Sequence, residues 1–230
     1  MVAFRTIPTM LVERSLHPTW LSNAYVLAAE EGAEAVFVDS GAPLEPLIEA
    51  VESHRLTPTH LLLTHGHADH VAGNDELVRR YGVEVVTDGV ETGGLRIEAL
   101  ATPGHSDDGV SFVVGDICFT GDTLFRDAVG GGPAVDMRRS VMDVLMTLPH
   151  ETRVLPGHTD ETTIGREWEE NPFIRFWREL EGEDGRSCRV LGEEAPLVVW
   201  SPDYDGKGKA LVRFAGGDEA IVGASRIEGL

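Results

Sequence analysis

The sequence predicts an α/β fold, in which mixed sheets are covered by helices, followed by a small antiparallel β module. Up to residue 180, short β-type runs alternate with segments of helical periodicity. A polar, glycine-containing stretch over residues 181–186 then interrupts this pattern. The remaining residues hold short apolar runs and an Asp205-Gly206 turn signal, which is typical of antiparallel strands.

The individual elements follow from local patterns. Strands are expected where β-branched and aromatic residues gather, and helices where apolar residues recur every three or four positions. The expected helices cover residues 44–51, 69–80, 138–148 and 163–180. The expected strands cover residues 4–12, 24–29, 35–39, 60–64, 83–87, 95–101, 110–114, 117–120, 153–155, 189–191, 197–200, 210–215 and 219–224.

These elements suggest two domains, a main domain over residues 1–180 and the β module over residues 187–230. A unit as short as the β module rarely folds alone, so we expect it to dock on the main domain. Gly130-Gly131-Gly132 lacks the lysine and hydroxyl residues of a phosphate loop and is interpreted as a flexible loop near the site. Lys207 and Lys209 are interpreted as a solvated hairpin tip.

The charge balance excludes several classes of partner. The 230 residues include 39 acidic and 19 basic side chains, which gives a net charge of −20. Nucleic acids and anionic membrane surfaces would be repelled, so neither is expected as a partner. No apolar run approaches the ~18 residues of a membrane span, and no leader is recognisable. Cys118 and Cys188 do not form a disulfide framework. We expect a cytoplasmic protein whose partner is a small molecule, and a homo-oligomer is compatible with the sequence.

One short segment dominates the chemistry: Thr64-His65-Gly66-His67-Ala68-Asp69-His70. Side chains two positions apart on an extended chain face the same way, so His65 and His67 can share one ion. The following helix turns Asp69 and His70 toward a second position. Neutral imidazole and carboxylate are preferred ligands of borderline divalent metals, although hydrogen-bonded structural histidines are the alternative.

Three further positions supply the same donor types just after expected strands. His105 and His158 each follow a Pro-Gly pair, and Asp122 follows a Thr-Gly pair. Each position alone is a weak signal. With the first segment they supply seven nitrogen and oxygen ligands at strand ends.

The series His-x-His-x-Asp-His, Pro-Gly-His, Gly-Asp and Pro-Gly-His resembles the metallo-β-lactamase superfamily, and within it the glyoxalase II-like branch. The resemblance covers about residues 4–180 and includes Asn23-Ala24-Tyr25, Val38-Asp39-Ser40-Gly41 and Asn171-Pro172-Phe173. It implies an αβ/βα sandwich with two divalent metal ions, zinc first, with iron or manganese as alternatives.

The resemblance also implies the role of each ligand. The first metal would be held by His65, His67 and His105, the second by Asp69, His70 and His158, and Asp122 would bridge both, with Asp69 also catalytic. A metal-bridging hydroxide would then attack a small ester or thioester. The chain departs from the branch at Gly131, where relatives commonly carry an arginine, and the basic contacts to glutathione are not identifiable.

Two other functions remain open on the sequence. The first is a mononuclear iron oxidoreductase resembling the persulfide dioxygenases, with iron on His65, His105 and Asp122. The second is a binding or regulatory protein that has kept a metal site. The complete ligand set makes the binding or regulatory protein the least favoured of these functions, and the dinuclear hydrolase is the leading interpretation.

Overall fold

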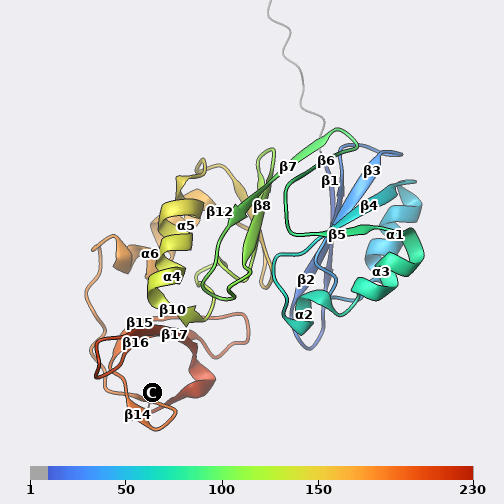
Figure 1. The fold of residues 1–230 in the computed structure, drawn as a ribbon. Coiled ribbons are helices and arrows are strands. Elements are labelled where there is room, and N and C mark those ends of the chain that lie inside the picture. The colour runs from blue at the N-terminus through green and yellow to red at the C-terminus, as the bar shows by residue number, and fades with distance from the viewer. Residues whose placement is uncertain (1–9, 230) are drawn as a thin grey trace, which may run out of the picture. The chain divides into compact units, whose positions relative to one another are not determined.

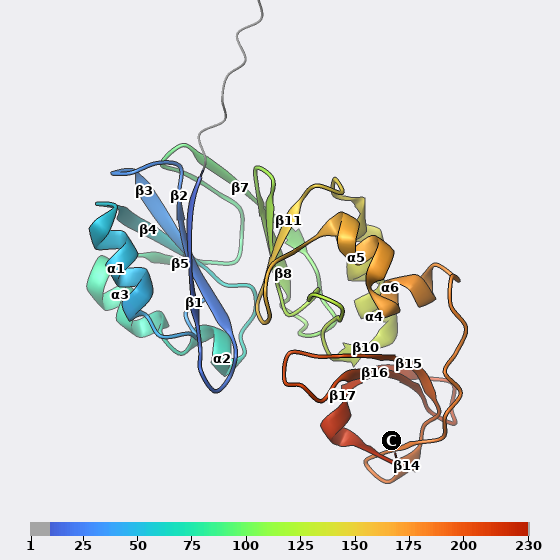
Figure 2. The same cartoon turned by 180° about the vertical axis from the view of Figure 1, so that it is seen from behind.

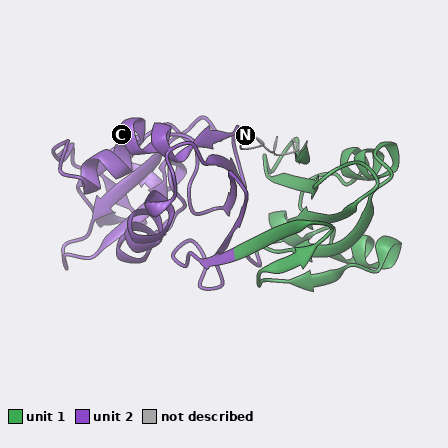
Figure 3. Ribbon diagram, turned by 90° about the horizontal axis from the view of Figure 1, so that it is seen from above, with its two compact units in different colours: residues 1–63, 67–98 green, residues 64–66, 99–230 purple. Residues whose placement is uncertain are grey.

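The computed structural model of the chain describes residues 10–229. Contacts between residues divide the described part of the chain into two compact units, which Figure 3 colours separately. Unit 1 comprises residues 10–63 and 67–98, and unit 2 comprises residues 64–66 and 99–229. The expected division into residues 1–180 and 187–230 stays a prediction.

Unit 1 is a five-stranded sheet with helices on one face (Figure 1). Its strands lie in the order β1 (Leu11–Leu16), β2 (Asn23–Ala28), β3 (Glu34–Val38), β4 (Thr57–Leu62) and β5 (Glu84–Val86). Helices α1 (Glu45–Ser53) and α3 (Asn74–Tyr81) pack against it, and their Leu47 and Leu77 share a core with Phe37 of β3. Most of the expected strand over residues 4–12 lies outside the described residues, and β1 begins only at Leu11.

The single helix expected over residues 69–80 is wrong, because the chain breaks at Gly73 into α2 (Ala68–Val71) and α3. The amide N–H of Gly73 donates to the carbonyl oxygen of Ser40 at 3.0 Å. A Cβ atom at this glycine would lie 2.6 Å from that same oxygen. The interruption of the helix at Gly73 therefore lets the loop after β3 pack close to α2.

Unit 2 contains a second sheet, in which strands lie in the order β12-β11-β9-β8-β7. β7 (Leu95–Ala101), β8 (Val110–Val114) and β9 (Ile117–Gly121) are antiparallel neighbours, and β11 (Arg153–Pro156) pairs parallel to β9. β12 (Thr162–Thr163) closes the edge. At its start, within unit 1, β7 pairs with the short strand β6 (Val90–Thr92), which the sequence analysis did not predict.

Both expected long helices of unit 2 are interrupted. The helix expected at 138–148 begins earlier, as α4 (Ala134–Arg138), and continues through wider π turns over Arg139–Val144 and a 3-10 turn over Leu145–Thr147. The helix expected at 163–180 is two helices, α5 (Ile164–Glu170) and α6 (Pro172–Trp177). Asn171 ends the first helix and caps the second, because its side-chain oxygen accepts from the amides of Phe173 and Ile174.

The C-terminal residues form two small sheets (Figure 2). β15 (Leu197–Ser201), β16 (Lys209–Arg213) and β17 (Glu219–Gly223) continue into β10 (Gly132–Pro133), and β13 (Arg189–Val190) lies between β14 (Glu193–Glu194) and β18 (Ile227–Glu228). Val198, Leu211 and Ile221 belong to the same buried cluster as the residues of α4 and α6. Part of the expected β module thus shares the core of unit 2. No helix in the described part of the chain is long and apolar enough to cross a membrane.

Candidate metal centre

The segment Thr64–Gly66 follows β4 in the chain and packs within unit 2. The amide of Val110 donates to the carbonyl oxygen of Thr64 at 2.8 Å. The backbone of Gly121 also lies close to Thr64, since a Cβ at Gly121 would lie 2.6 Å from the Thr64 side chain. This packing places His65 among the strand ends that carry His105 and Asp122.

Four of the seven expected ligands gather in unit 2. His105 Nε2 and His158 Nε2 lie 3.5 Å and 3.4 Å from the same carboxylate oxygen, Oδ2 of Asp122. The rings of His65 and His105 meet edge to face with their centroids 5.1 Å apart. Both nitrogen–oxygen distances exceed the usual length of an N–H···O bond, and this spacing is what ligands of a shared cation adopt.

In two of these imidazoles, His105 and His65, the Nδ1 nitrogen has a hydrogen-bond partner of its own. His105 Nδ1 lies 2.9 Å from the carbonyl oxygen of Gly131, and His65 Nδ1 lies 3.1 Å from Thr64 Oγ1. A metal-ligating histidine typically donates its second N–H to such an acceptor, which fixes the tautomer and leaves Nε2 as the ligand.

Unit 1 carries the other three expected ligands. His70 is completely buried, and its Nδ1 lies 2.8 Å from Oδ2 of Asp39, while its Nε2 lies 3.8 Å from Oδ2 of Asp69. His67 is exposed at the position before α2. Gly41 allows the loop after β3 to touch α2, because a Cβ there would lie 1.6 Å from the Asp69 carbonyl oxygen.

The donor set fits divalent metal ions, because it combines imidazole nitrogens with carboxylate oxygens. Asp39 and Gly131 hold imidazoles from behind, as outer partners of a metal site do. Near His65, the hydroxyl of Ser106 and then the backbone N–H groups of Asp108 and Gly66 lower the pKa of Asp108, against the effect of partial burial. This carboxylate adds negative charge beside the group.

Two expectations about nearby loops are wrong. Gly130-Gly131-Gly132 is not a flexible loop, because Gly132 pairs with Ile221 of β17 and Gly131 accepts from His105. Lys209 is not at a solvated tip: it is 8% exposed, and its Nζ lies 3.0 Å from Oδ2 of Asp203. Only Lys207 of the two lysines is exposed.

The sequence analysis missed two residues that contact candidate ligands. Asp39 was part of the family resemblance but received no role, although a carboxylate directly after a buried strand was an available signal. Tyr204 stacks on His158 with ring centroids 4.2 Å apart and planes 7° apart. No feature of the sequence near Tyr204 indicates that contact.

Comparison with sequences of known proteins identifies relatives over most of the chain. A family model described as the metallo-beta-lactamase superfamily matches residues 17–91. A protein from Mycobacterium tuberculosis is 34% identical, over 66% of this chain and 92% of its own length. A probable metallo-hydrolase from Bacillus subtilis is 30% identical with the same coverages. A hydroxyacylglutathione hydrolase from Xylella fastidiosa is 36% identical over 58% of both chains.

Solved structures give similar matches. The crystal structure of ETHE1 from Myxococcus xanthus has a TM-score of 0.64 and 31% identity, covering 74% of this chain and 91% of that one. The protein TTHA1623, solved in a di-iron-bound form, has a TM-score of 0.59 and 32% identity, covering 69% of this chain and 98% of its own. These matches leave roughly a quarter to a third of the present chain uncovered.

Proposed function

This chain belongs to the metallo-beta-lactamase superfamily, and from that membership we propose that it is a cytoplasmic, dinuclear metal-dependent hydrolase of small esters or thioesters. The observation that carries the proposal is the convergence of His105 Nε2 and His158 Nε2 on one oxygen of Asp122. A carboxylate approached by two imidazoles in this way suits a bridging ligand. The relatives named as a metallo-hydrolase and a hydroxyacylglutathione hydrolase support the reaction class.

Two ligand sets are proposed. His65, His67 and His105 would hold one ion, Asp69, His70 and His158 would hold the other, and Asp122 would contact both. His65 and His67 of the first set and Asp69 and His70 of the second set lie within one short motif over residues 65–70. Zinc is the proposed metal, and iron is the alternative that the di-iron relative supports.

Two divalent ions bound there would lower the pKa of a coordinated water toward ~7 and polarise the substrate carbonyl. The protein's own part is to hold the ligands rigidly and to move protons. Asp39 accepts from His70 and the Gly131 carbonyl from His105, which keeps each ring in one orientation. Asp69, whose side chain is about 30% exposed, is the carboxylate we propose to exchange a proton with the substrate.

Metal analysis combined with substitution of Asp122 tests the proposal. Wild-type protein is expected to bind two equivalents of zinc and to hydrolyse model thioesters or esters. Asp122→Ala should lose at least one equivalent and its activity, because the bridging carboxylate contacts both ions. Asp116→Ala, which changes an exposed carboxylate on the turn before β9, is the matched control and should retain both. An Asp122→Ala protein with two zinc ions and full turnover would contradict the proposal.

A mononuclear iron oxidoreductase is the second candidate, favoured by one observation. The three residues such an enzyme would use, His65, His105 and Asp122, all lie in unit 2, with His105 in contact with both others. Metal analysis separates the two candidates. One equivalent of iron, with no hydrolysis of esters or thioesters, would favour the oxidoreductase.

A further inference from the structure

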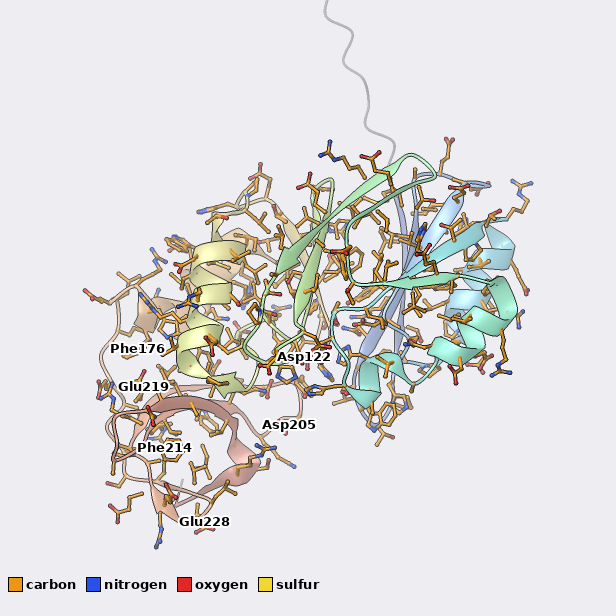
Figure 4. The ribbon with its side chains drawn as sticks, viewed as in Figure 1. Asp122, Phe176, Asp205, Phe214, Glu219 and Glu228 are labelled. Carbon is orange, nitrogen blue, oxygen red and sulfur yellow. The ribbon has the colours of Figure 1, made fainter. Side chains whose placement is uncertain are left out.

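One loop between the C-terminal strands lies against a candidate ligand of unit 2. This loop, residues 202–208, connects β15 to β16 and is called here the Tyr204 loop. Figure 4 labels Asp205, the neighbour of Tyr204, on this loop on the side where Asp122 lies.

The Tyr204 loop is anchored at both ends. The Ser201 hydroxyl donates to the backbone carbonyl of Asp127, in the segment that follows Asp122. At the other end, the Lys209 ammonium group pairs with Asp203 at 3.0 Å, and both side chains are at most 10% exposed. This ion pair links Asp203, near the start of the loop, to Lys209 directly after its end.

The anchored loop places Tyr204 flat against His158. The two ring centroids are 4.2 Å apart and the ring planes differ by 7°. Phe125 meets the His158 ring edge to face at 5.9 Å and the Tyr204 ring at 5.7 Å. Lys209 Nζ lies 5.6 Å from the centroids of both Phe125 and Tyr204.

This aromatic contact restricts the imidazole to one plane. His158 follows Gly157, whose amide donates to the Gly121 carbonyl, so its backbone is held at the end of β11. Rotation of the imidazole about its last side-chain bond would drive it into the stacked Tyr204 ring, and Phe125 lies beside the stacked pair, at a similar distance from both rings. In the plane that these rings allow, Nε2 lies 3.4 Å from Asp122 Oδ2.

We propose that Tyr204 is a positioning residue of the metal centre, which fixes the His158 imidazole so that its Nε2 is directed at the position of the second metal. The inference rests on the proposed function, since it takes His158 as a metal ligand. It assigns to the C-terminal residues a part in the metal centre without making any of them a ligand.

The test uses the full-length protein with two variants of Tyr204 and one control. Tyr204→Phe keeps the stacked ring, whereas Tyr204→Ala removes it. Phe214→Ala removes an aromatic ring that packs against the separate small core of the C-terminal strands. Figure 4 labels Phe214 among those strands, apart from the Tyr204 loop.

The first measurement is cobalt titration followed by visible absorption. Tyr204→Ala is expected to bind the second equivalent about tenfold or more weakly, as for other outer partners of metal ligands, with an altered absorption band. Tyr204→Phe and Phe214→Ala should bind as the wild type does. Wild-type affinity and spectrum in Tyr204→Ala would overturn the inference, and so would equal weakening in Phe214→Ala.

The second measurement needs no metal. In the metal-free protein, the ring-proton resonances of His158 are expected to be shifted by the stacked Tyr204 ring, and the shift should be lost in Tyr204→Ala but kept in Tyr204→Phe. If wild-type protein binds no second cobalt ion, the proposed function fails, and these resonances alone decide the inference. Unchanged His158 resonances in Tyr204→Ala would overturn it.

Discussion

At the scale of single residues, Asp39 shows how much the candidate ligands depend on side chains behind them. Its carboxylate lies 2.8 Å from Nδ1 of the fully buried His70, and its backbone adopts a φ of +55°, which aspartate and asparagine tolerate better than most residues. Loss of the carboxylate would leave the His70 ring without its outer acceptor.

We therefore expect Asp39→Ala to weaken metal binding by about 10–100-fold, measured by competition with a chelator. Asp39→Asn keeps an acceptor oxygen and tolerates the backbone conformation, so its affinity should lie closer to that of the wild type. Asp75→Ala, an exposed carboxylate on α3, is the control and should have no effect. Unchanged affinity in folded Asp39→Ala protein would show that the carboxylate does not support His70.

At the scale of elements, the start of α5 is held by a buried carboxylate. Glu167 is completely buried and accepts from the Asp127 amide at 2.9 Å, the Asn171 side chain at 3.0 Å and the Arg166 guanidinium at 2.6 Å. These bonds tie α5 to α6 and to the segment that follows Asp122. Removing the carboxylate would take this acceptor from the Asp127 amide and the Asn171 side chain, whereas Arg166 would keep its ion pairs with Asp127 and Glu170.

Glu167→Ala should accordingly lower the free energy of unfolding, measured by urea denaturation, by about 1–3 kcal/mol for each donor that loses its acceptor. The neighbouring exposed residue Glu169 provides the control, since Glu169→Ala should change the free energy of unfolding by less than about 0.5 kcal/mol. Equal effects of the two substitutions would contradict the role given to Glu167.

A second carboxylate makes the stability of unit 1 depend on pH. Glu34 at the start of β3 accepts from the Thr92 hydroxyl at 2.5 Å and the Gly93 amide at 3.0 Å, and these bonds lower its pKa. A carboxyl whose pKa is lower in the folded state stabilises that state above its unfolded pKa of ~4.3. The contribution is lost as the pH falls through the folded pKa.

Glu34→Gln is thus expected to lower the denaturation midpoint near neutral pH, with a difference from wild type that shrinks as the pH falls below ~4. Glu84→Gln on β5 serves as the control, because Glu84 is exposed. A difference that persists at low pH would contradict the assignment to the ionised carboxylate.

At the scale of the whole molecule, the shared core of unit 2 predicts how the C-terminal strands unfold. Leu211 of β16 is completely buried and belongs to the same cluster as Cys118 of β9. Leu211→Ala should cost about 2–5 kcal/mol, and Val135→Ala, at a side chain that is 68% exposed, should cost little. Hydrogen exchange across a urea series should show β9 and β16 losing protection at the same midpoint. Earlier loss in β16 alone would favour the domain boundary that the sequence predicts near residue 180.

The sequence was sufficient for features that rest on local pattern. The strands at residues 95–101 and 110–114 have the expected bounds, because apolar runs there are bounded by turn residues. β6 and β10, at three and two residues, are too short to show a period. The interruption of the helix at Asn171-Pro172 could have been predicted, since proline disfavours helix at the preceding residue. The burial of Lys209 could not, because it depends on Phe125, which is distant in the sequence.

The pairing of β10 with β17 also has a consequence for synthesis on the ribosome. Pro133 finds its partner in Ala220, 87 positions later, and Gly131 beside it accepts from His105. The chain grows at about 5–20 residues per second. The segment around Gly131, which accepts from His105, is therefore synthesised several seconds before β17, the strand that pairs with β10. Metal loading of the mature centre should therefore follow translation, and nascent chains stalled before residue 220 should release their ions to a chelator faster than the finished protein.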